Sequence, residues 1–285
     1  MSSYNFEYYK PKSIEEAASI FDQMDQQGKD PMYFSGGTEI ITLRRLNQLK
    51  TGAVIDIKAI QECNVFEFHE DSLLTGAALT LTKVEELNLF PLLSQTVSEI
   101  ADKTARNKIT AGGNICGQIF YREAVLPFLL TDSELMIAGS DGRRNAPIKD
   151  VFNKQLLLNR GEFLVQMKTN RKYTEMPFVS IKRRRQWNTG YPLLTVAALK
   201  AEQGIRVAIS GLTHFPFRSA QMEDALNRTD LAFEKRINLA LSLLDVPILN
   251  DTEGSARYRL FVLKNTLYDI FQELEGDKLA SIEEH

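Results

Sequence analysis

Two short glycine-containing segments carry residue types that suit the binding of phosphate groups. The first is Ser35-Gly36-Gly37-Thr38, and the second, much further along the chain, is Thr110-Ala111-Gly112-Gly113-Asn114. Glycine has no Cβ, so backbone N–H groups beside it can approach a phosphate closely, and the threonine hydroxyls add further donors. The pair of segments therefore predicts that the two phosphates of one pyrophosphate lie between them. The alternative is that each segment is an ordinary turn.

Other motifs for nucleotides and metals are absent from the sequence. It contains no GxGxxG segment and no GxxxxGK[ST] segment, which disfavours a Rossmann or Walker nucleotide site. His69, His214 and His285 have no metal-ligand companion at helical spacing, so no metal site is predicted. The basic run 182–185 beside Trp187 is interpreted as a solvated loop, or as a contact with a phosphate or a partner subunit.

The composition is that of an ordinary globular protein. The 285 residues are 44% hydrophobic and 25% charged, which suffices for a buried core in one large or two smaller domains. A formal net charge of −3 gives no basic field that would attract nucleic acid or anionic lipid. Two isolated cysteines and the lack of a long apolar run predict a soluble protein of the reducing cytoplasm, with no membrane contact.

The hydrophobic pattern predicts mixed short strands and helices around the two segments. A helix is expected from Ser13, as its N-cap, to about Met24. Two further helices are expected at 81–93 and 96–105, divided near Pro91. Strands are predicted at 32–34 and 53–57, in two runs between 65 and 78, and at 133–138 and 163–168.

A second block of elements follows the polar run 170–176, which we interpret as a domain boundary. Strands are predicted at about 177–182, 193–200 and 205–210, and helices at about 218–227, 231–244 and 255–274. Two blocks of mixed elements, without regular alternation of strand and helix, indicate an α+β protein rather than a doubly wound parallel sheet.

At this point the sequence resembles a known family. Segment 33–40, YFSGGTEI, is similar to the first FAD loop of the flavin subunits of xanthine and carbon monoxide dehydrogenases. Segment 110–115, TAGGNI, is similar to their second FAD loop, and LPFLLTDSELMIAG resembles the stretch that follows it. In the C-terminal half, FVSIKRRRQWNTGYPLLTVAA, GLTHFPFR and Tyr258-Arg259 resemble further parts of the same family.

The resemblance implies a particular fold. Residues 1–172 should form an FAD-binding domain of the vanillyl-alcohol-oxidase/p-cresol-methylhydroxylase type, with subdomains at about 1–57 and 58–172. Residues 173–285 should form the family's C-terminal domain, a small three-stranded sheet with a helical bundle.

The resemblance also implies which residues bind the cofactor. Segment 33–40 and the second loop should hold the pyrophosphate and ribityl region, and Lys182 takes the place of a lysine near the flavin ring. Leu164 matches an apolar residue that packs near the isoalloxazine, and Ile100 falls where the family lines the adenine. The expected FAD-binding residues are Tyr33, Phe34, Ser35, Gly36, Gly37, Thr38, Glu39, Ile40, Ile100, Thr110, Gly112, Gly113, Asn114, Glu123, Leu164 and Lys182.

The sequence departs from the family pattern in two places. After the second loop the family continues with small residues, Ser-Pro and an aspartate, whereas this chain has CGQIFYRE at 116–123. Glu123 stands at the position of the aspartate and could accept the same hydrogen bond with a longer side chain. An aspartate ahead of the second strand of the C-terminal domain is replaced near Gly190.

The function implied by the resemblance is electron transfer within a molybdenum hydroxylase. A molybdopterin-binding subunit would oxidise the substrate, an iron–sulfur subunit with [2Fe–2S] clusters would relay electrons, and FAD on this chain would pass them to NAD+ or another acceptor. A purine such as xanthine is the favoured substrate of the complex. The alternatives are a stand-alone flavin oxidoreductase and a non-catalytic scaffold or assembly protein that kept the fold and lost FAD.

Overall fold

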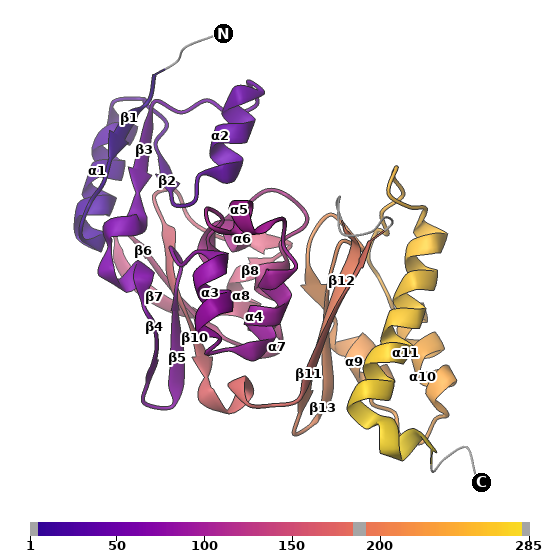
Figure 1. The fold of residues 1–285 in the computed structure, drawn as a ribbon. Coiled ribbons are helices and arrows are strands. Elements are labelled where there is room, and N and C mark those ends of the chain that lie inside the picture. The colour runs from indigo at the N-terminus through magenta and orange to yellow at the C-terminus, as the bar shows by residue number, and fades with distance from the viewer. Residues whose placement is uncertain (1–4, 185–191, 281–285) are drawn as a thin grey trace.

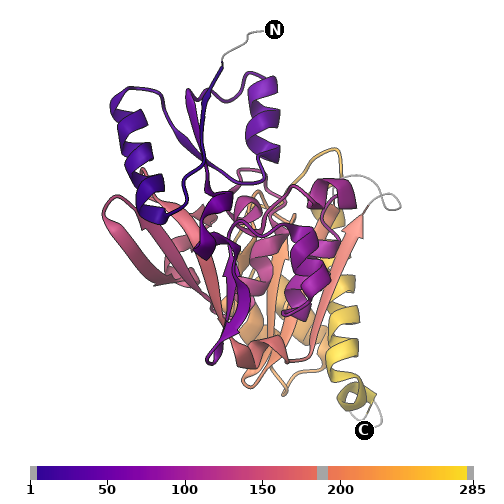
Figure 2. The same cartoon turned by 60° about the vertical axis from the view of Figure 1, so that its left-hand side comes forward.

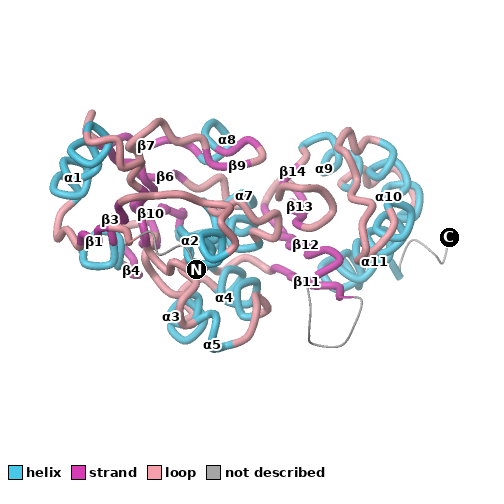
Figure 3. The backbone as a smooth tube through the Cα atoms, turned by 90° about the horizontal axis from the view of Figure 1, so that it is seen from above, coloured by secondary structure: helices cyan, strands magenta, loops and turns pink. Residues whose placement is uncertain are grey.

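The computed structural model describes residues 5–184 and 192–280, which form three successive parts (Figure 1). A small N-terminal sheet with two helices is followed by a five-stranded sheet with short helices, and then by a C-terminal sheet with three helices. Figures 2 and 3 show the C-terminal sheet standing between the middle part and the C-terminal helices. The architecture is α+β, as the sequence predicted.

The N-terminal part is a parallel three-stranded sheet with strand order β1-β3-β2. Ser13 caps its first helix by accepting the N–H of Glu16, as predicted, and that helix buries Phe21. The second helix buries no side chain. The elements are β1 (Glu7–Tyr9), α1 (Ile14–Gln26), β2 (Met32–Phe34), α2 (Thr38–Arg45) and β3 (Ala53–Asp56).

The middle part is an antiparallel sheet with strand order β4-β5-β10-β6-β7. Its strands are β4 (Phe66–His69), β5 (Ser72–Gly76), β6 (Glu134–Gly139), β7 (Gly142–Pro147) and β10 (Phe163–Asn170), with a separate small hairpin of β8 (Phe152–Asn153) and β9 (Gln155–Leu156). Its helices are α3 (Leu81–Leu87), α4 (Pro91–Ser98), α5 (Lys103–Arg106), α6 (Ala111–Cys116), α7 (Leu126–Leu130) and α8 (Ile148–Val151). Four 3-10 turns lie at Ile57–Ala59, Gln61–Asn64, Glu123–Val125 and Arg171–Thr174.

The helices of the middle part divide just before Pro91, as predicted, but their bounds differ: α3 ends at Leu87, α4 runs from Pro91 to Ser98, and α5 covers only Lys103–Arg106. Pro91 occupies the first turn of α4, where its missing N–H costs no intrahelical bond. The second glycine-containing segment is not a loop but begins the helix α6, because the hydroxyl of Thr110 caps it. The β4–β5 and β6–β7 hairpins turn at Glu70 and Gly142, and both residues have positive φ.

The C-terminal part is an antiparallel sheet with strand order β11-β12-β13-β14. Its three long strands match the prediction, and a two-residue fourth strand is added at the edge. The elements are β11 (Phe178–Arg184), β12 (Pro192–Ala201), β13 (Gly204–Ser210), β14 (Phe217–Arg218), α9 (Ala220–Leu226), α10 (Phe233–Ser242) and α11 (Ala256–Ala280).

The central strand of this sheet is buried on both faces. Ala197 and Leu199 of β12 pack into the core of the middle part, whereas Val196 and Ala198 pack into a core beneath α9, α10 and α11. Since side chains of a strand alternate between its faces, one strand serves two cores. The middle part therefore packs on one face of the C-terminal sheet, and the C-terminal helices pack on the other.

Four residues that were named from the sequence lie outside the described residues, namely Arg185, Trp187, Gly190 and His285. Within the described residues no helix is long and apolar enough to cross a membrane. The same residues contain no group of three or more His, Cys, Asp or Glu side chains that could hold a metal ion.

Candidate functional site

The first glycine-containing segment joins the end of β2 to the beginning of α2. Gly37 occupies the N-cap position with φ of +71°, a left-handed conformation that glycine adopts without strain. No side chain among the described residues caps this helix, and the first N–H groups of a helix have no acceptor within it. These groups carry the positive end of the helix dipole, so they can donate to a phosphate.

Gly36 brings this segment against the chain that leads into the second segment. A Cβ at Gly36 would lie 2.1 Å from the carbonyl oxygen of Lys108 and 3.3 Å from the Cα of Ile109, so a side chain does not fit there. Nearby, the hydroxyl of Ser35 is buried without a hydrogen-bond partner among the described residues. A buried hydroxyl of this kind is costly unless something satisfies it, which fits a bound oxygen-rich ligand.

The second segment lets a ligand approach its backbone closely, but its glycine N–H groups are already hydrogen-bonded. The hydroxyl of Thr110 accepts the N–H of Gly113 at 3.2 Å, and the N–H of Gly112 donates to the carbonyl oxygen of Ala77 at 2.9 Å. Gly112 also packs tightly, because a Cβ there would lie 2.5 Å from that of Ala77. Gly113 is exposed, and an added Cβ would meet only the Thr110 side chain among the described residues. A ligand can therefore reach the backbone at Gly113.

Lys58 adds a positive charge at the first segment, and sequence reasoning missed it. Its Nζ lies 2.8 Å from the carbonyl oxygen of Ser35 and 2.8 Å from the carboxylate of Asp56. The ammonium also stands 4.8 Å from the centre of the Phe34 ring. Strands β2 and β3 are parallel neighbours, with Phe34 opposite Asp56, so residues just beyond both strands meet. That pairing is the signal that could have identified Lys58.

Glu123 and Lys182, both expected to contact the flavin region, are brought together as a buried ion pair. Their side chains are 2% and 5% exposed, and Nζ lies 2.8 Å from the carboxylate. Lys182 also donates to the carbonyl oxygen of Glu99 at 2.7 Å, and Thr195 lies 3.5 Å from the same carboxylate. The pair therefore joins the chain after α6 to the C-terminal sheet.

Two more of the expected side chains are bonded to backbone beyond α6. The side-chain oxygen of Asn114 accepts the N–H of Ala124 at 3.0 Å. The carboxylate of Glu39 accepts the N–H groups of Gln118 and Ile119. Both side chains thus fix the course of the segment that departs from the family pattern.

The expected aromatic and apolar residues pack largely inside the protein. The Tyr33 ring stacks between Phe21 and Phe163, its hydroxyl donates to the carbonyl oxygen of Gly161 at 2.9 Å, and burial raises its pKa. Leu164 is buried in the core of the middle part.

The remaining expected residues lie near the two segments with different exposures. Ile100, just after α4, is buried, and its carbonyl oxygen accepts a hydrogen bond from Arg106 at 3.3 Å. Thr38 is exposed and Ile40 is half-buried, both in the first turn of α2.

Arg122 is a second residue that sequence reasoning missed. Its side chain is almost fully buried, and it donates to the carbonyl oxygens of Gly117 and Lys154. Burial lowers the pKa of its guanidinium. It lies in the stretch 116–123, for which the family pattern gave no guide, so no signal in the sequence pointed to it.

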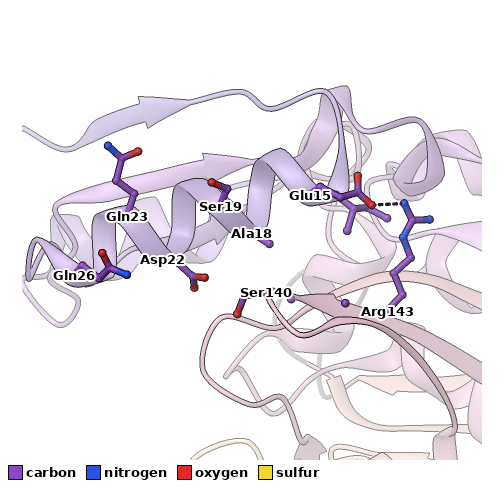
Figure 4. A pocket seen from close by; sticks show the side chains of 11 residues that line it. Glu15, Ala18, Ser19, Asp22, Gln23, Gln26, Ser140 and Arg143 are labelled. Carbon is purple, nitrogen blue, oxygen red and sulfur yellow. Dashed lines mark hydrogen bonds and ion pairs between the residues drawn. The ribbon is translucent and has the colours of Figure 1, made fainter.

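A separate hollow of about 460 Å³ lies between α1 and the turn joining β6 to β7. In Figure 4, Glu15 and Arg143 form an ion pair at one end, and Ser19, Asp22 and Ser140 line the rest. None of its lining residues belongs to either glycine-containing segment. The hollow therefore plays no part in the candidate cofactor site.

The family described as "FAD binding domain in molybdopterin dehydrogenase" matches residues 4–168, which is more than half of the chain. The chain belongs to this family. Residues 4–168 are thus the FAD-binding part of an oxidoreductase subunit of the molybdenum hydroxylase type.

Three relatives agree with the family. The carbon monoxide dehydrogenase medium chain of Hydrogenophaga pseudoflava is 26% identical over 169 residues, 57% of this chain and 58% of the relative. The nicotinate dehydrogenase FAD-subunit of Eubacterium barkeri is 23% identical over 304 aligned positions, 98% of each chain. The xanthine dehydrogenase FAD-binding subunit of Escherichia coli O157:H7 is 29% identical over 143 residues, 48% of this chain and 49% of the relative. The aligned part of this chain therefore spans less than two thirds of two relatives and nearly all of the third.

A solved structure shows the same fold. A chain of carbon monoxide dehydrogenase from Hydrogenophaga pseudoflava superimposes with a TM-score of 0.83, at 21% identity, covering 94% of this chain and 96% of that one. The likeness includes the C-terminal part, which lies beyond the residues matched by the family.

Proposed function

We propose that this chain is the FAD-binding electron-transfer subunit of a molybdenum hydroxylase. The observation that carries the proposal is the close approach of Gly36 to Lys108, just before the second glycine-containing segment. Beside it lie a helix N-terminus and the buried hydroxyl of Ser35, neither of which has a hydrogen-bond partner from a side chain of the described residues. A pyrophosphate placed there would accept hydrogen bonds from the first turn of α2 and approach the backbone at Gly113. FAD, when bound, accepts electrons singly and releases them as a pair.

The residues of the proposed site divide into two groups. Ser35, Gly37, Thr38 and Gly113 offer groups that the cofactor can bond or approach. The others act through contacts within the protein, by packing or by fixing the chain beyond α6, and they comprise Tyr33, Phe34, Gly36, Glu39, Ile40, Ile100, Thr110, Gly112, Asn114, Glu123, Leu164 and Lys182. Among them, Leu164 is proposed to support the isoalloxazine and Ile100 the adenine.

The proposal includes the domain organisation and the partners. An FAD-binding domain of the vanillyl-alcohol-oxidase/p-cresol-methylhydroxylase type would span 1–172, with subdomains at about 1–57 and 58–172, and the C-terminal domain would span 173–285. An iron–sulfur subunit and a molybdopterin-binding subunit would complete the enzyme, with NAD+ or another acceptor taking the electrons. The relatives support this organisation, because they are named as the medium chain or FAD subunit of such enzymes.

The proposed substrate of the whole enzyme is a purine such as xanthine. The support is the xanthine dehydrogenase subunit, which has the highest identity of the three relatives, although over only about half of its length. Turnover of xanthine by the purified complex would support the proposal, and turnover of carbon monoxide or nicotinate alone would contradict it.

The first test is the absorption spectrum of the purified chain, with the cofactor identified after denaturation. Flavin bands near one per chain and release of FAD rather than FMN are expected, because FMN has no pyrophosphate to bridge the two segments. Co-purification of an iron–sulfur subunit would then support the position of this chain in the complex.

A scaffold that has lost the cofactor is the second candidate, and one observation favours it. The N–H groups of Gly112 and Gly113 and the side chains of Glu123 and Lys182 are already satisfied within the protein. A colourless protein that fails to bind added FAD would favour the scaffold and overturn the proposed site.

A further inference from the structure

Glu39 belongs to α2, but its carboxylate is bonded to the chain just beyond α6. Oε1 accepts the N–H of Gln118 at 2.8 Å, and Oε2 accepts the N–H of Ile119 at 3.2 Å. A Cβ at Gly117 would lie 2.9 Å from Oε2, so the carboxylate rests directly on the backbone. Arg122 attracts the same carboxylate and donates to the carbonyl oxygen of Gly117 at 3.1 Å.

Two adjacent backbone donors with a guanidinium nearby form a small anion-binding arrangement. Bonds of this kind, in which the acceptor is charged, are stronger than those between neutral groups. Their consequence here is that the negative charge of Glu39 is held close to positive partners. Without them, a carboxylate in the first turn of α2 would repel a pyrophosphate at the same helix end.

Helix α2 is not anchored by a buried side chain of its own. None of its side chains is buried, and Ile41 is 47% exposed. The guanidinium of Arg44 stands 4.4 Å from the centre of the Phe6 ring, a contact within the N-terminal part. The carboxylate of Glu39 and the close approach at Gly36 therefore tie the start of α2 to the chain on either side of the second segment.

We infer that Glu39 is a positioning residue for the cofactor: its carboxylate sets the separation between the N-terminus of α2 and the second segment that the pyrophosphate must bridge. This inference rests on the proposed FAD site. It assigns Glu39 no contact with FAD, in contrast to the role implied by the family resemblance.

The sign of one affinity change tests this role. If Glu39 were merely a negative charge near the pyrophosphate, Glu39→Ala would strengthen FAD binding, most clearly at low salt. A positioning role predicts the opposite, a Kd raised by roughly tenfold or more, since a hydrogen bond to a charged group is worth about that factor. Titration followed by flavin fluorescence measures the Kd, and Glu39→Gln, which keeps one acceptor oxygen, should fall between wild type and Glu39→Ala.

Glu15→Gln is the matched control. Glu15 also lies in the first turn of a helix and bonds Arg143 at 2.7 Å, but it lies in the hollow beneath α1. This control should leave the Kd unchanged. An unchanged or lower Kd for Glu39→Ala would overturn the inference.

A second test uses the contact between Glu39 and Gly117. Alanine at 117 suits the backbone, which has φ of −60° and ψ of 162°, but its Cβ would crowd Oε2. Gly117→Ala should therefore weaken FAD binding in the wild-type background and much less in the Glu39→Ala background. Additive effects of the two changes would contradict the coupling, because independent sites add.

Hydrogen exchange separates failure of this inference from failure of the FAD site. In the cofactor-free chain, Glu39→Ala should speed exchange in peptides that cover 117–122, whereas Glu15→Gln should not. A wild-type chain that binds no FAD would overturn the proposed function, yet this exchange experiment would still decide whether Glu39 holds the two segments together. Unchanged exchange would refute the positioning role even if FAD binds.

Discussion

Replacing Lys182 with methionine should destabilise the protein far more than removal of an ordinary surface charge. Glu123 is 2% exposed and its ion-pair partner 5%, so the change leaves a carboxylate buried without its cation. Breaking one side of such a pair costs about 3 kcal/mol or more. For a chain of this size, 3 kcal/mol corresponds to a fall of roughly 6–12 °C in Tm.

Thermal melting of three variants measures this effect. Lys182→Met should show the large fall, whereas the double variant Lys182→Met/Glu123→Leu should recover most of it, because an apolar pair of similar volume needs no counter-charge. Lys103→Met is the control, since Lys103 and Glu86 are 65% and 61% exposed and pair at 3.3 Å. Such exposed pairs contribute little. A double variant as unstable as the single one would refute the reasoning.

Three further predictions concern the glycine-containing segments and the buried thiol. Gly36→Ala should abolish FAD retention, seen as loss of flavin absorbance, because its Cβ would lie 2.1 Å from the Lys108 carbonyl oxygen; retention at wild-type level would contradict this. Thr110→Val removes the cap of α6 and should lower stability to unfolding in urea by about 1 kcal/mol, with Thr110→Ser close to wild type. Burial, aided by Glu62, raises the pKa of Cys63 to about 12, so in a Cys116→Ser background the folded protein should resist alkylation at pH 8. The thiol of the unfolded chain ionises at about pH 8.5, so the free energy of unfolding should fall as the pH rises from there toward 12. A free energy of unfolding that stays constant over this range would contradict the prediction.

Local patterns in the sequence predicted much of the fold. The cap at Ser13, the strand at Met32–Phe34 and the three long C-terminal strands follow from residues that are neighbours in sequence. The division of helices near Pro91 is confirmed, but the first helix was predicted to reach 93, whereas α3 ends at Leu87 and Pro91 begins α4. Proline suits the first turn of a helix as well as the stretch after its end. Sequence alone does not distinguish those two uses.

The sequence predicted which two segments form the candidate site, but not which groups their residues contact. Gly-Gly pairs indicated close approach of backbone, and Gly36 and Gly113 provide it. The amide of Gly112 is bonded to Ala77 instead, because α6 packs against the chain that follows β5. The roles of Glu39 and Arg122 depend on backbone groups distant in sequence or in an unfamiliar stretch, and residue types carry no information about those partners.

The doubly buried strand β12 has a consequence for how the protein unfolds. Detaching the C-terminal helices would expose Val196 and Ala198, and detaching the middle part would expose Ala197 and Leu199. Neither part can detach without exposing one apolar face of β12 to solvent. The two parts should therefore unfold in one cooperative transition. Limited proteolysis should accordingly release no stable half, and the two parts should enter the proposed complex as a single folded unit.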